Sequence, residues 1–272
     1  MNTRYFILFL CLAVTVACED VVDLDLPEGE SLLQVDGFIS AKDTLHFVRV
    51  SRTLSYNASG DFPPVSATVV LQDDKGRIDT LREESSGNGL YIIDRPGVVG
   101  NTYTLNIFTD DGQQYQSQPE LLAPVTPIDS IYLEEDEFEE DKYFVVFDTS
   151  DPVGLGNYYR WKQYIDESYQ NKAENLTFAS DEFVEGNPIF GISITESIDL
   201  GKKVKIEQLS ISKRNFEYLD VLRSQTAFVG SIFDPPPAPI KGNLFNVNNP
   251  DEVVAGFFSA SDISSATIVV RN

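Results

Sequence analysis

Short segments with alternating apolar and polar residues follow one another from residue 32 onward. In residues 67–72 and 103–108 an apolar side chain occupies every second position, which is the period of a strand with one buried face. Turn sequences such as DDKG at 73–76, SGNG at 86–89 and PGVVGN at 96–101 separate these segments. Short strands at this spacing indicate a sandwich of antiparallel sheets.

A boundary is expected near residue 125, where Pro124 and Pro127 interrupt the pattern. Beyond it we expect one helix at 213–225, because Ser212 can cap its start and apolar residues recur at helical spacing. Residues 166–188 are polar without a clear period, and we expect a long surface excursion there. The strand-like segments of this half are KYFVVFDTS, YYRWKQYI, IFGISITESI, KVKIEQLSIS, VVAGFFSAS and ATIVVRN.

The expected fold class is mainly β. Residues 32–125 are expected to form an immunoglobulin-like β-sandwich, because GLYIIDRPGVVGNTYTLNIFTDDGQQYQS at 89–117 resembles the later strands of such a domain, with a Tyr at the corner after a Gly-containing turn. This resemblance concerns the fold alone. Residues 126–272 are expected to form a second antiparallel β-rich domain with one helix.

The N-terminus has the form of an export signal. Arg4 precedes an apolar run at 5–16, which is shorter than the roughly 20 residues that a membrane-spanning helix needs. The sequence TVAC, which ends in Ala17 and Cys18, resembles a bacterial lipobox, in which the chain is cut before the cysteine and the thiol is acylated. We therefore expect residues 1–17 to be a lipoprotein signal peptide and Cys18 to carry lipid. An ordinary secretory signal with an incidental cysteine, or a short buried helix, are the alternatives.

Residues 18–31 are acidic and read as a tether between the lipid and the fold. Removal of the signal peptide discards Cys11, and lipidation consumes Cys18, so the mature chain would hold no disulfide. Each buried methylene of the acyl chains contributes about 0.8 kcal/mol, and several chains together anchor firmly. The expected partner of this end is therefore membrane lipid, reached through acylated Cys18.

Charge excludes one class of partner. The formal net charge is -23, and such a surface repels phosphate backbones, so we expect no nucleic-acid binding. Hydrophobic residues make up 42% of the chain and aromatic residues 11%, which is typical of a folded protein and not of a disordered acidic one.

Candidate chemistry is sparse. His46 is the only histidine and lies in a strand-like segment, which favours a packed or surface residue over a catalyst or metal ligand. No G-x-S-x-G elbow or phosphate-binding loop occurs. The acidic run EEDEFEED at 134–141 could offer oxygen ligands to calcium, but a solvated hairpin loop is the simpler interpretation. We expect no catalytic residue, no metal and no cofactor; a glycan-acting enzyme with a carboxylate pair is a remote alternative.

Two further stretches leave alternatives open. Residues 233–246, FDPPPAPIKGNLFN, would form a rigid extended segment that serves either as a binding surface or as a loop that covers one end of a sheet. Trp161 with Tyr158, Tyr159 and Tyr164 could stack on a sugar or fill a core, since both faces of one strand are occupied.

Several segments together resemble a known family. LLQVDGFI, ATVVLQDDKG, VGNTYTLNI, VVAGFFSAS and above all GSIFDPPPAPIKGNLFN are similar to the domain of unknown function 4249 family of outer-membrane lipoproteins. The resemblance implies a role beside a TonB-dependent receptor, assisting ligand capture or uptake, and it supplies no catalytic residues. An adhesive or structural surface module is the alternative function. Which side of the outer membrane the protein faces stays open.

Overall fold

The computed structural model describes residues 31–271 except 56–57, 195 and 228–239. This part of the chain is mainly β, with several antiparallel sheets and one α-helix, as expected. The signal peptide, Ala17, Cys18 and nearly all of the tether lie outside the described residues. No helix in the described part is long and apolar enough to cross a membrane.

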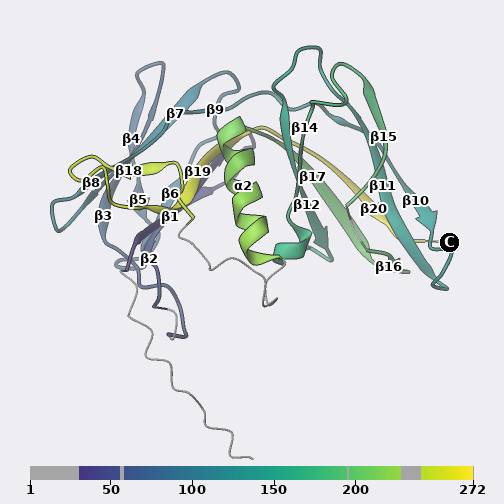
Figure 1. The fold of residues 1–272 in the computed structure, drawn as a ribbon, viewed down its shortest axis with the longest axis horizontal. Coiled ribbons are helices and arrows are strands. Elements are labelled where there is room, and N and C mark those ends of the chain that lie inside the picture. Colours follow the sequence, from purple (N-terminus) through teal and green to yellow (C-terminus); the bar gives the residue numbers. More distant parts are fainter. Residues whose placement is uncertain (1–30, 56–57, 195, 228–239, 272) are drawn as a thin grey trace, which may run out of the picture. The chain divides into compact units, whose positions relative to one another are not determined.

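Two sheets pack face to face and form the first sandwich (Figure 1). The first sheet contains, in spatial order, β19 (Ala255–Ser261), β1 (Leu33–Ser40), β2 (His46–Arg52), β6 (Leu90–Ile93) and β5 (Arg82–Glu83). The second contains β18 (Leu244–Asn246), β8 (Gln114–Ser117), β7 (Thr102–Thr109), β3 (Ala67–Asp73) and β4 (Ile78–Thr80), with β9 (Glu120–Leu121) beside β7.

The alternation in the sequence sets the core of the first sandwich. Val69 and Leu71 on β3 and Leu105 and Ile107 on β7 are fully buried, as the strand period predicts. Tyr103 is also fully buried, and its hydroxyl accepts a hydrogen bond from the backbone N–H of Val98 at 2.7 Å. That bond ties the turn before β7 to the core, as a tyrosine corner does.

The C-terminal part of the chain completes this sandwich. β19 pairs with β1 in parallel, and β18 pairs with β8. Gly256 on β19 has φ +85, and a Cβ there would lie 2.0 Å from the carbonyl oxygen of Val35, so only glycine fits this pairing. The division of the chain at residue 125 stays a prediction, and these pairings are a connection that the local pattern did not indicate.

A second sandwich surrounds a separate core. Its first sheet contains β10 (Ile128–Glu135), β11 (Lys142–Ser150), β15 (Pro188–Ser193) and β16 (Ile198–Asp199). Its second contains β13 (Ser168–Tyr169), β12 (Tyr158–Ile165), β17 (Lys203–Ile211) and β20 (Ile263–Val269), with β14 (Thr177–Ser180) also beside β12. Phe147 and Trp161 face each other between the sheets, with ring centroids 6.2 Å apart.

The helix α2 (Lys213–Thr226) covers the other face of the second sheet (Figure 1). Ser212 caps it by accepting a hydrogen bond from the N–H of Asn215 at 3.1 Å, which confirms the predicted start. Leu219 is buried, and Phe216 and Leu222 pack in the same cluster. The 3₁₀ turn η1 (Ala173–Asn175) precedes β14.

Two loop predictions have different outcomes. The acidic run at 134–141 joins β10 to β11 as a hairpin, as predicted. The expectation of a long surface excursion at 166–188 is wrong for β14, which pairs with β12 along its whole length. Only Phe178 of β14 is buried, so this edge strand is too short and too exposed to show a period.

Candidate functional site

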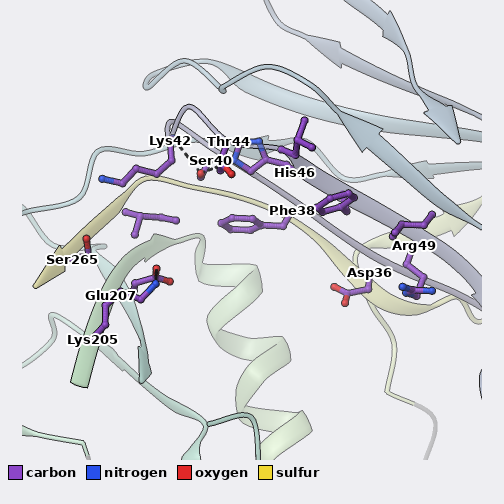
Figure 2. Close-up of a pocket in the computed structure, with 14 residues that line it drawn as sticks. Asp36, Phe38, Ser40, Lys42, Thr44, His46, Arg49, Lys205, Glu207 and Ser265 are labelled. Carbon is purple, nitrogen blue, oxygen red and sulfur yellow. Dashed lines mark hydrogen bonds and ion pairs between the residues drawn. The ribbon is translucent and has the colours of Figure 1, made fainter. Parts of the chain in front are cut away.

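A pocket of about 680 Å³ lies where the outward face of β1 and β2 meets β17 and β20. Figure 2 shows the side chains that line it. They come from β1, the β1–β2 hairpin, β2, the start of β6, β17 and β20: Asp36, Phe38, Ser40, Lys42, Thr44, Leu45, His46, Phe47, Arg49, Leu90, Lys205, Glu207, Ile263 and Ser265.

Strand alternation gives the pocket its first wall. On β1, Val35 and Ile39 enter the core, so Asp36 and Phe38 lie on the opposite face. β2 presents Phe47 outward in the same way, and 39% of this side chain is exposed. The wall is therefore aromatic at its centre and charged toward its edge, a combination that suits a ligand with apolar and polar parts.

The second wall is a polar network on β17. The ammonium of Lys205 contacts Glu207 Oε1 at 2.7 Å, and the hydroxyl of Tyr164 donates to Glu207 Oε2 at 3.0 Å. Lys205 Nζ also lies 3.9 Å from the ring centroid of Tyr164. Both oxygens of Glu207 are thus occupied, and its charge is balanced within the protein.

Two cations of the first wall have no such balance. Arg49 stands opposite Asp36 in the β1–β2 register, yet its guanidinium makes no ion pair or hydrogen bond with another residue in the described ranges. The same holds for the ammonium of Lys42 in the hairpin. In Figure 2, Lys42 lies at one end of the pocket and Arg49 at the other, with Phe38 between them.

A third cation lies behind Phe38. Lys162 Nζ is 5.1 Å from the ring centroid of Phe38 and 5.7 Å from that of Tyr169, within the range of cation–π attraction. Burial, with a smaller contribution from the charge of Arg160, lowers the pKa of Lys162 to about 8. The cations Lys42, Arg49 and Lys162 therefore gather around Phe38, in a protein whose net charge is -23.

His46 is buried, which is one of the two placements that its strand context left open. It is 3% exposed, and its Nε2 lies 2.8 Å from the hydroxyl oxygen of Ser40, which is fully buried. Burial lowers the pKa of His46, so the imidazole is neutral near pH 7. A serine and a histidine at this distance form a potential nucleophile and base, but the Ser40 hydroxyl has no exposed surface through which a substrate carbonyl could reach it.

The sequence-predicted residues divide between core and surface. Trp161 and Tyr159 are buried in the second sandwich, which settles their role as core residues. Tyr158 packs on Phe216 of α2, with ring centroids 5.2 Å apart. Tyr164 holds Glu207 at the pocket wall, as described above. In the part of the chain that the structure covers, no group of three or more His, Cys, Asp or Glu side chains is placed to hold a metal ion.

Of the proline-rich stretch 233–246, residues 233–239 lie outside the described residues, which resume at residue 240. Beyond it, Asn243 links the sandwich internally, because its side chain donates to the carbonyl of Phe258 at 2.8 Å and accepts from that residue's N–H at 2.9 Å. Asn243, the first asparagine of the motif KGNLFN, therefore has a structural role.

Sequence reasoning did not find the pocket. Its residues belong to segments whose apolar alternation is visible, but the outward positions Asp36, Phe38, Phe47 and Arg49 show no motif. The nearest signal is a pair of aromatic residues at outward positions of neighbouring strands, where a solvated face would carry polar side chains.

Comparison with known proteins identifies the family. The family model described as "Domain of unknown function (DUF4249)" matches residues 19–267, so the chain belongs to this family. None of the curated proteins matches it.

Proposed function

We propose that this member of the DUF4249 family is a lipid-anchored, non-catalytic accessory protein of the outer membrane, which binds a small ligand and assists a TonB-dependent receptor in its capture or uptake. The observation that carries the proposal is the open pocket between β1–β2 and β17–β20. Aromatic side chains there lie beside the cations Lys42 and Arg49, which form no ion pair with any residue that the structure describes. These are features of a preformed site for a small molecule.

The membrane part of the proposal depends on the N-terminal sequence. The apolar run before Cys18 and the small residues that precede it support cleavage between Ala17 and Cys18 and acylation of the thiol. Mass spectrometry of the mature protein tests this directly. We expect an N-terminal cysteine that carries acyl chains, and a Cys18→Ala variant that leaves the membrane fraction. An unmodified N-terminus would contradict the anchor.

The receptor part depends on the family resemblance. Affinity purification of the tagged protein from solubilised outer membranes is expected to recover a receptor of the TonB-dependent class. The Cys18→Ala variant serves as control for contacts that need only membrane proximity. Failure to recover any receptor would overturn this part and favour the adhesive alternative, which a deletion strain with normal uptake and lost attachment would support.

A further inference from the structure

We infer that the ligand of this pocket is an amphipathic organic anion, whose acidic group is held by Arg49 and whose apolar or aromatic body lies against Phe38, Leu45 and Phe47. This inference rests on the proposed function, because it concerns the same pocket. It commits to the charge and the amphipathic character of the ligand, and a carboxylate, phosphate or sulfonate would satisfy it.

The centre of the first wall exposes apolar side chains to solvent. Leu45 is 51% exposed and Phe47 39% exposed, two positions apart in one hairpin. The ring centroid of Phe38 lies 5.1 Å from the Lys162 ammonium, and Phe38 also packs against the cluster under α2. A ligand that covers these side chains removes apolar surface from water, which stabilises the complex by about 25 cal/mol per Å².

Some of the charged side chains that line the pocket are already paired within the protein, and others are available to bind a ligand. Lys205 and Tyr164 occupy both oxygens of Glu207. The charge of Asp36 acts on Lys162, since it is one of the charges that raise the pKa of that amine against the effect of burial. Among the described residues that line the pocket, the cationic groups without an ion pair are the guanidinium of Arg49 and the ammonium of Lys42.

Arg49 is the better of the two anion holders. Its guanidinium presents a planar fork that binds carboxylate or sulfonate through two parallel hydrogen bonds. It belongs to the strand β2, whose backbone is fixed by β1 and β6 on its two sides. Lys42 lies in the exposed hairpin loop and supplies a point charge at the other end of the pocket. The first contact is therefore assigned to Arg49.

A matched pair of dyes separates the two halves of the inference. Anilinonaphthalene sulfonate is an aromatic anion, and phenylnaphthylamine is the same ring system without the sulfonate. Both increase in fluorescence in an apolar site, so titration of residues 19–272 gives a dissociation constant for each. We expect the sulfonate to bind more tightly than the neutral dye, and competition between them to show that they share one site.

Three single variants give the direction of each effect. Arg49→Gln is expected to weaken sulfonate binding by about 10-fold, as the loss of a hydrogen bond to a charged group does, and to leave the neutral dye unchanged. Asp36→Asn is expected to tighten sulfonate binding by about threefold, because it removes a nearby like charge. Phe47→Ser is expected to weaken both dyes, since it removes apolar wall.

Two controls exclude other sites. Arg52→Gln removes a cation from the same strand outside the pocket, where Arg52 lies 3.7 Å from Asp111, and is expected to leave both constants unchanged. Phe183→Ser removes a side chain that is 91% exposed on a distant loop, and it is expected to have no effect either.

The outcomes distinguish the two proposals. If Phe47→Ser weakens both dyes but Arg49→Gln and Asp36→Asn change neither, the pocket binds ligands and the assignment of an anion is wrong. If Asp36→Asn weakens the sulfonate, the sign of the charge argument is wrong. If Phe47→Ser affects neither dye, the pocket is not a binding site, and the ligand-binding part of the proposed function fails with it.

Discussion

Gln208 is the polar centre of the second sandwich, and its replacement by methionine is expected to destabilise the fold. The side chain is fully buried. Its oxygen accepts from the indole N–H of Trp161 at 2.9 Å, and its nitrogen donates to the carbonyl of Thr126 at 3.0 Å and to the hydroxyl of Thr149 at 2.9 Å. Gln208 lies on β17, and these bonds link it to Trp161 of β12 and to Thr149 of β11.

The expected magnitude follows from the groups that lose their partners. Methionine has nearly the same volume, so the packing change is small. Thr149 keeps a partner, because its hydroxyl also donates to the carbonyl of Pro127 at 2.9 Å. The indole N–H of Trp161 and the carbonyl of Thr126 would each lose the partner that Gln208 provides. An orphaned buried group costs about 1–3 kcal/mol, and since Thr126 is only half-buried, we expect a loss of about 2–4 kcal/mol in the free energy of unfolding.

Urea unfolding measures this loss, because Trp161 is the only tryptophan and its emission reports on the same core. Gln163→Met is the matched control. Gln163 lies on the same face of β12 as Trp161 and is 9% exposed. Its side chain forms no hydrogen bond with another residue of the described part, so we expect the free energy of unfolding to change by less than about 0.5 kcal/mol. If Gln208→Met unfolds at the same urea concentration as the unmodified protein, the network does not stabilise the fold and the reasoning is refuted.

Three further variants test other features. Lys162→Met should be more stable than the unmodified protein near pH 7 by up to about 3 kcal/mol, because burial lowers the pKa of Lys162 to about 8 and so makes its charged form costly in the folded protein. This cost is fully present below about pH 8 and disappears as pH rises from about 8 toward the ordinary pKa of the amine. Equal stabilities of the two proteins near pH 7 by denaturant unfolding would contradict it. Ser212→Ala should cost about 1 kcal/mol through the lost helix cap, measured as a lower urea midpoint with an unchanged slope. Gly256→Ala should cost more than about 3 kcal/mol, because a Cβ would meet the carbonyl of Val35 in a left-handed backbone; an unaltered melting temperature by circular dichroism would show that β19 does not pair with β1 in this way.

Local pattern was sufficient to predict much of the fold. The segments KYFVVFDTS and YYRWKQYI coincide with β11 and β12. Every second residue of β12 from Tyr159 to Gln163 is buried, and β11 contains a short continuous apolar run whose centre is buried. Ser212 marked the start of α2, since a cap is decided by one side chain and its neighbours. Such features depend on residues that are close in sequence, and a single sequence records them.

Long-range pairing was not predictable in the same way. VVAGFFSAS reads as a strand, but nothing in its alternation shows that its partner is β1 and that the pairing is parallel. The pocket has the same origin, because it exists only where outward residues of β1 and β2 meet outward residues of β17 and β20. Arg49 indicates a binding site only when the pocket residues that surround it in space are known.

The parallel pairing of β19 with β1 also constrains the order in which the chain can fold. Synthesis delivers residues 33–40 long before residues 255–261, so one edge of the first sheet stays unpaired throughout that interval. An open edge is a template for pairing with another chain, and contacts between distant segments form slowly. Between the synthesis of β1 and its pairing with β19, the new polypeptide is therefore at its most vulnerable to aggregation, and a holding chaperone would protect it most at this edge.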